Sequence, residues 1–227
     1  MGERAALAAT VGAVSTEAAP DSALERTWWF RTAAVLVAPR AVFVTLRDDS
    51  SKAAEARQEP ILLIAGLAGI AGVLGTTTFR GALNDGSVSM GLVAVLAFFA
   101  GALYALAVYW LGGGLLYRAA RRLGSEGSWR RSRHVLALAA TPLALSLLTL
   151  WPIRIAVYGT DLFRTGGDDY GRGDAIFGGI DYAFIGWSVW LLVIGVRSVH
   201  GWTWARAAAT VALAAVFPVL VVLAATV

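Results

Sequence analysis

The stretch MGLVAVLAFFAGALYALAVYWLG, residues 90–112, carries no charged side chain over 23 positions. A helix needs about 20 apolar residues to cross the roughly 30 Å hydrocarbon core of a bilayer. A helix is also the structure in which a single segment satisfies its own backbone hydrogen bonds in lipid. This stretch therefore predicts a transmembrane helix and places the chain among integral membrane proteins.

Four further apolar blocks of similar length lie at about residues 61–79, 135–151, 177–196 and 207–226. Of the 227 residues, 58% are hydrophobic and 15% are charged, and the mean hydropathy is +0.67. Soluble domains contain about 25% charged residues, so this composition disfavours a soluble fold. We expect an all-α polytopic membrane helix bundle with five transmembrane helices.

The N-terminal part differs from these blocks. Residues 1–26 are mostly Ala, Ser, Thr, Glu and Pro without a period, which predicts a disordered cytoplasmic tail ahead of a membrane domain at residues 27–227. Residues 27–47 combine an aromatic cluster, spaced arginines and two apolar runs too short to cross a bilayer. This pattern predicts an N-terminal interfacial helix with its rings at headgroup depth. The alternative is a helix packed on other protein.

Small residues recur in the first two blocks at the spacing that lets membrane helices approach closely. They are Gly66, Gly69, Gly72, Gly75, Ala97, Gly101 and Ala105. They lie inside apolar spans, whereas a phosphate-binding loop follows a strand and opens a helix. We therefore interpret them as helix-packing positions.

The basic residues predict the orientation. With five spans, one side of the membrane receives fifteen Lys and Arg residues and the other side receives four. Basic residues accumulate on the cytoplasmic side, so we expect the N-terminus in the cytoplasm and the C-terminus outside. The predicted location is the inner (plasma) membrane, as a multi-pass protein.

No residue pattern indicates catalysis, a metal or a cofactor. The chain has no Cys, which excludes disulfides and thiolate chemistry, and it has no hydrolase, zinc-protease or nucleotide-binding motif. The two histidines, His134 and His200, stand at predicted cytoplasmic ends of spans, and we expect them to be interfacial polar residues. The loop at residues 160–174 holds four Asp and four Gly; a solvated loop is favoured over a Ca²⁺ site because the spacing does not match an EF-hand.

Two sets of polar residues remain as candidate sites. Asp181 lies inside the fourth block, where an unpaired carboxylate is costly, and Arg154 is the nearest cation in the predicted topology, so we expect an intramembrane pair. The segment from Arg118 to Arg133 combines arginines with glycines and a tryptophan and is predicted to contact anionic lipid headgroups or to dock an unidentified protein. Its candidate residues are Arg121, Arg122, Gly124, Gly127, Trp129, Arg130 and Arg131. No basic tract indicates nucleic-acid binding.

Several short motifs resemble one known family. The central part of the chain resembles the signature of Yip-domain proteins, the Ypt/Rab-interacting membrane proteins. The similar segments are residues 123–129 (LGSEGSW), the arginines that follow them, and residues 138–143 (LAATPL). Residues 38–43 (APRAVF) and 201–207 (GWTWARA) add to the resemblance, which covers about residues 28–227. The chain has Ser125 where the family often has a second glycine, and a long Gly/Asp loop between the third and fourth spans.

The resemblance implies a non-enzymatic integral membrane protein. Eukaryotic members are linked to Rab GTPases and vesicle traffic, but the arginines outnumber the single lysine, Lys52, by 18 to one, which suggests a prokaryotic member without Rab partners. We expect a membrane scaffold or adaptor. The alternative is a solute or ion transporter or channel subunit, and a lipid-handling enzyme ranks third. A polar cavity at mid-membrane would favour transport, whereas a packed apolar core with a structured cytoplasmic face would favour a scaffold.

Overall fold

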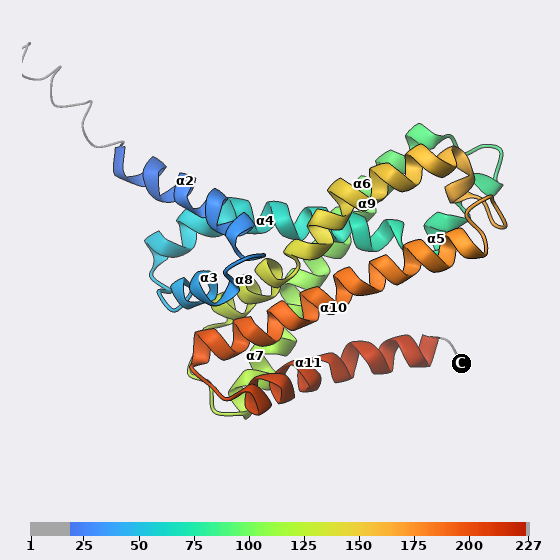
Figure 1. The fold of residues 1–227 in the computed structure, drawn as a ribbon. Coiled ribbons are helices and arrows are strands. Elements are labelled where there is room, and N and C mark those ends of the chain that lie inside the picture. Colours follow the sequence, from blue (N-terminus) through green and yellow to red (C-terminus); the bar gives the residue numbers. More distant parts are fainter. Residues whose placement is uncertain (1–18, 226–227) are drawn as a thin grey trace, which may run out of the picture.

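The computed structural model describes residues 19–225, and the side chains of residues 27–220. Within this part every regular element is a helix (Figure 1). Four helical stretches of the described chain are long and apolar enough to cross a membrane: Ser51–Leu74, Met90–Arg122, Trp129–Phe163 and Arg172–His200. A fifth apolar helix, α11 (Trp204–Ala225), follows them, and its stretch Trp204–Leu220 is shorter than the other four. The all-α polytopic bundle is therefore confirmed.

The first span begins earlier than the predicted residues 61–79. Helix α4 covers Ser51–Leu74 because Ser50 caps it, its hydroxyl accepting a hydrogen bond from the Ala53 N–H at 3.3 Å. The helix ends before Gly75, and a short helix α5 (Thr77–Arg80) and the 3₁₀ turn η1 (Ala82–Asn84) follow. The earlier start places Arg57, which the prediction left outside the membrane, within a spanning helix.

The N-terminal segment forms two helices instead of one. Helix α2 (Ala19–Ala34) and helix α3 (Pro39–Thr45) are separated by residues 35–38, and Ala38 directly precedes a proline, where helical backbone is disfavoured. Helix α2 begins at Ala19, inside the segment predicted as a tail, and residues 1–18 lie outside the described part. Trp28 is buried, at 3% exposure, and α2 packs on α4, whereas Phe30 is exposed. The segment therefore packs on the protein through Trp28, as in the alternative given above, while Phe30 stays exposed.

The second span is one long rod. Helix α6 (Met90–Ala107) continues through a π-helical turn, η2 (Val108–Gly112), into α7 (Gly113–Arg122). It crosses α4 at the predicted small residues: a Cβ placed on Gly101 would lie 2.6 Å from the Ile70 Cα, and one on Gly69 would lie 2.7 Å from the Ala105 Cβ. Only glycine permits this approach.

The third span is broken in its middle. Helix α8 (Trp129–Ala139) and helix α9 (Thr141–Tyr158) meet at Ala140, directly before the Thr141-Pro142 pair, since Pro142 lacks the N–H that would continue the helix. The 3₁₀ turn η3 (Gly159–Phe163) leads into the loop before α10 (Arg172–His200). The predicted block 135–151 therefore contains a bend.

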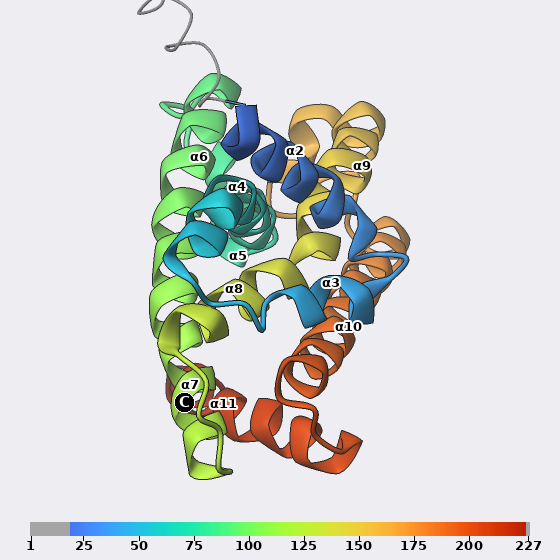
Figure 2. The same ribbon diagram turned by 90° about the vertical axis from the view of Figure 1, so that its left-hand side faces the viewer.

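Helix α4 occupies the centre of the bundle, with α6, α9, α2 and α8 packed around it (Figure 2). The largest apolar core joins α2, α3, α4, α8 and α10 and includes Phe43, Leu46, Ile61, Leu138 and Leu191. We call the end formed by residues 46–50, 123–134 and 197–206 the basic end; its predicted side is cytoplasmic. The opposite end, formed by residues 75–89 and 159–172, is called the loop end.

Candidate functional site: two polar networks and a groove

The LGSEGSW segment forms a defined turn at the basic end. Gly124 has φ +85°, the N–H of Ser125 donates to the Ala120 carbonyl at 3.0 Å, and the N–H of Gly124 donates to the Arg121 carbonyl at 3.0 Å. This pair of bonds is a Schellman motif, which ends α7. Ser125 has no positive φ, so a side chain is tolerated at this position, and its hydroxyl accepts from the Gly127 N–H at 3.0 Å.

Asp49 is the centre of the network at the basic end. Its carboxylate lies 3.2 Å from Arg57 Nη2 and 3.1 Å from Arg130 Nε, and the Ser128 hydroxyl donates to it. Burial alone would raise the pKa of Asp49, but the hydrogen bonds from Ser128 and Arg130 and the charges of Arg130 and Arg131 outweigh it and lower the pKa below its ordinary value. Asp49 is thus held as an anion that joins α4 to the start of α8.

Arg57 continues this network into the bundle. Its guanidinium is fully buried and donates to the Asp48 carbonyl at 2.7 Å and to His134 Nδ1 at 2.8 Å. His134 is also fully buried, with Nε2 at 3.3 Å from Gln58 Oε1 and its ring stacked on Tyr109. His134 therefore lies inside the protein at the basic end, where the bond from Arg57 links α4 and α8.

Trp129 packs against other residues on this surface. Its ring contacts Trp110 edge to face at 5.4 Å between centroids, and the guanidinium of Arg133 lies 3.8 Å from the Trp110 centroid and 5.1 Å from that of Trp129. Trp129 is still 45% exposed. Half-buried tryptophans beside arginine are typical of the membrane interface.

Side chains bonded to backbone carbonyls connect the remaining loops at the basic end. Arg131 Nη2 donates to the Arg47 carbonyl at 2.8 Å, and Arg47 Nη2 donates to the Ser198 carbonyl at 2.7 Å. Arg206 donates to the Leu123 carbonyl. The exposed members of the predicted docking set are Arg121, Arg122, Gly124 and Trp129, and Arg121 also donates to the Ser125 carbonyl at 3.1 Å.

The loop end holds a second charged network, which contains the predicted pair. Arg154 Nη1 lies 3.1 Å from Asp181 Oδ2, so the structure brings these two residues together. Asp169 Oδ2 lies 3.7 Å from Arg154 and 3.6 Å from Arg80, and Arg80 binds Asp174 at 2.5 Å. Sequence reasoning missed Arg80 and the two loop aspartates, because nothing in their spacing indicates how the loop folds back. No three His or acidic residues in the described part could hold a metal.

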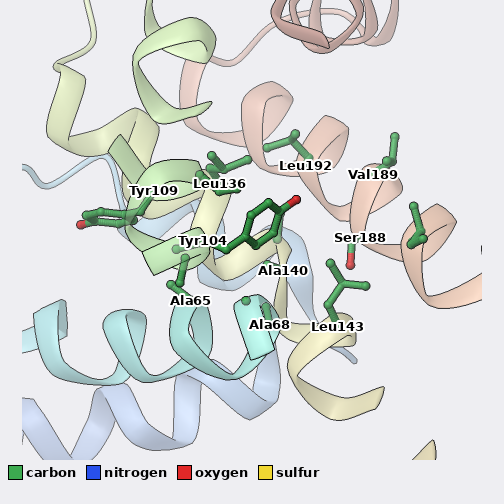
Figure 3. Close-up of a pocket in the computed structure, with 16 residues that line it drawn as sticks. Ala65, Ala68, Tyr104, Tyr109, Leu136, Ala140, Leu143, Ser188, Val189 and Leu192 are labelled. Carbon is green, nitrogen blue, oxygen red and sulfur yellow. The ribbon is translucent and has the colours of Figure 1, made fainter. Parts of the chain in front are cut away.

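A groove between α6 and α10 runs from the loop end to the middle of the bundle. It consists of two adjoining cavities of about 220 and 780 Å³, which share Ala68, Tyr104, Leu143 and Ile185 in their linings. The deeper cavity is apolar apart from Tyr104, Tyr109 and Ser188 (Figure 3). The wider cavity opens at the loop end, where Arg80, Arg154, Asp174 and Asp181 line it.

These features define a polytopic α-helical membrane protein with a bend in its third span and a cross-linked basic end. The family model of the Yip1 domain matches residues 33–226, so the chain belongs to the Yip1 domain family. No curated protein and no solved structure shows significant similarity to the chain.

Proposed function

We propose that the chain is a non-enzymatic membrane scaffold or adaptor that docks a protein partner on its basic end at the cytoplasmic face. The observation that carries this proposal is the cross-linked surface there. An ion pair of Asp49 and hydrogen bonds from Arg47, Arg131 and Arg206 join four chain segments there. The segments are residues 46–50, 123–128, 129–134 and 197–206.

Such a surface suits docking for two physical reasons. A surface whose side chains are already ordered loses little conformational entropy when a partner binds. Its exposed groups are also of the types that dominate contact energies, since Arg122 is exposed and Trp129 is half exposed beside Arg133. The same arginines attract anionic headgroups at about 1 kcal/mol per basic residue near the surface, which would orient the domain without specifying a partner.

Site-specific photo-crosslinking in intact membranes tests the proposal. A photoreactive residue at Glu126, which is exposed at the basic end, should give discrete protein adducts, and one at Asp168, exposed at the loop end, should not give the same adducts. Trp129→Ala and Arg122→Ala should reduce the Glu126 adducts, with Arg172→Ala, another exposed arginine, as the matched control. Adducts to lipid alone at Glu126, or adducts insensitive to both variants, would contradict docking.

Transport remains the second candidate because the groove offers a polar opening at the loop end. Its deeper part is apolar and ends at Tyr109 and Leu136, where Arg133 lies over the Tyr109 ring at 5.1 Å. An apolar dead end opposes the passage of ions, since a charge there has no compensating groups. Ion flux into proteoliposomes above that of empty vesicles would favour transport over scaffolding.

A further inference from the structure

The groove between α6 and α10 has the depth of one membrane leaflet. Leu192, at its inner end, follows Asp181, at its charged opening, by 11 residues of α10. At 1.5 Å per residue this is about 16 Å, and half of a hydrocarbon core of about 30 Å is about 15 Å. From its charged opening to its inner end the groove therefore matches the depth of the loop-side leaflet, which leaves room for the headgroup and glycerol of a lipid and the first part of one acyl chain.

The groove also lies open to lipid along its side. Helix α6 packs on α4 and helix α10 packs on α9, so the two walls stand apart. Tyr104, Ile185 and Val189, which line the walls, are between 45% and 52% exposed in the protein alone. Helix α11 contacts α10 and α7 near the basic end and diverges from α10 toward its own C-terminal end (Figure 1). A chain from the bilayer can enter without unpacking a helix pair.

The opening carries charges of both signs. Arg80 and Arg154 lie among Asp169, Asp174 and Asp181, with the ion pairs given above, and these five side chains sum to a charge of −1. The Arg154 Nε–H is buried and has no acceptor among the described residues. A phosphodiester can accept from this N–H, and an ammonium group can donate to the carboxylates. A headgroup with negative charge alone would meet a cluster that is already net negative.

Ser188 supplies a separate observation deeper in the groove. Its side chain is 8% exposed, and its hydroxyl has no hydrogen-bond partner among the described residues. The oxygen points toward Leu143 of the neighbouring helix α9 (Figure 3). Buried hydroxyls are normally satisfied, and this one lies two helical turns below Asp181, where a bound lipid carries its ester carbonyls.

We propose that this groove binds one glycerophospholipid of the loop-side leaflet with an amine-bearing zwitterionic headgroup. The phosphate lies at Arg154 and Arg80, the ammonium at Asp174 and Asp181, and an ester carbonyl accepts from Ser188. The first carbons of one acyl chain fill the apolar part down to Leu192, about 6 Å further along α10, and the rest of the chain leaves through the open side of the groove. This site is at the end opposite the proposed docking surface and does not depend on it.

Native mass spectrometry of the delipidated full chain tests the site. The probes are phosphatidylethanolamine, phosphatidylcholine and phosphatidylglycerol with identical acyl chains. Phosphatidylethanolamine should bind most tightly, because the choline headgroup lacks N–H donors and the glycerol headgroup lacks the cation. Ser188→Ala should weaken its binding by about five-fold, as expected for one neutral hydrogen bond of about 1 kcal/mol.

Two leucine substitutions on α10 distinguish lipid binding in the groove from lipid binding elsewhere on the same helix. Ser188→Leu fills the groove and should abolish the adduct, whereas Gly186→Leu, at a position where an added Cβ meets nothing within 4 Å, should leave it unchanged. Val189→Phe narrows the groove from its exposed rim and repeats the test should Ser188→Leu fail to fold. Asp181→Asn should shift the preference toward phosphatidylglycerol.

Three results would overturn the proposal. They are equal binding of the three lipids, an adduct that survives both Ser188→Leu and Val189→Phe, and a dimer of the wild-type chain that Ser188→Leu dissociates, which would make a second copy the occupant. Failure of the crosslinking experiment at Glu126 would affect the proposed scaffold function alone.

Discussion

Replacing Asp49 by Asn removes the charge that compensates the buried Arg57. The Arg57 side chain is fully buried and that of Asp49 is 13% exposed, so most of the pair is removed from water. Breaking a buried ion pair from one side costs about 3–5 kcal/mol. Because Asp49 retains some exposure and asparagine still accepts hydrogen bonds, we expect the lower end, about 3 kcal/mol of the free energy of unfolding.

The neighbouring residue provides the control. Asp48 is exposed, and its side chain accepts from the Ser50 N–H, while its contact with Arg57 uses the backbone carbonyl. Asp48→Asn should therefore change the stability by less than about 0.5 kcal/mol. The measurement is equilibrium unfolding in mixed micelles, followed by tryptophan fluorescence and extended to a double-mutant cycle with Arg57→Met. Equal stabilities of the two Asn variants, or a cycle without coupling, would refute the central role of Asp49.

Three further predictions concern packing, orientation and pH. Gly101→Ala should destabilise the bundle by about 1–3 kcal/mol, because the added methyl group would overlap the backbone of α4. Gly66→Ala is the control and should cause no loss, because an added Cβ there meets nothing within 4 Å. Equal unfolding midpoints of the two variants would contradict the close crossing of α4 and α6. Single Cys residues at Glu126 and Asp168, both exposed, should be labelled only from inside and only from outside, and the reverse pattern would refute the orientation. The pKa of Asp49 in the folded protein is below its ordinary value of 3.8. The Asp49 carboxylate therefore stabilises the fold fully above pH 3.8, and this stabilisation is lost as the pH falls through the folded pKa. The difference in the free energy of unfolding between wild type and Asp49→Asn should accordingly disappear in acid.

The sequence predicted the fold class because long apolar blocks leave few alternatives in a bilayer. It predicted the Arg154 and Asp181 contact because both residues lie at one end of adjacent spans. It did not predict the buried contact of Arg57 with His134, since a block defined by hydropathy begins after the last charged residue, whereas the helix begins at its cap near Ser50. Hydropathy also cannot place Trp28, whose burial depends on how α2 crosses α4.

Helix α8 belongs to both of the sites described above. His134 joins it to Arg57 at the basic end, and Leu136, two residues further along, lines the inner end of the groove. The helix ends at Ala139, and both Ala140 and Leu143 also line the groove, so the bend before Pro142 lies against the space that an acyl chain would fill. The lining of the groove and the network around Asp49 therefore meet on one short helix, because His134 of α8 accepts from Arg57 of α4 while Leu136 of α8 lines the groove.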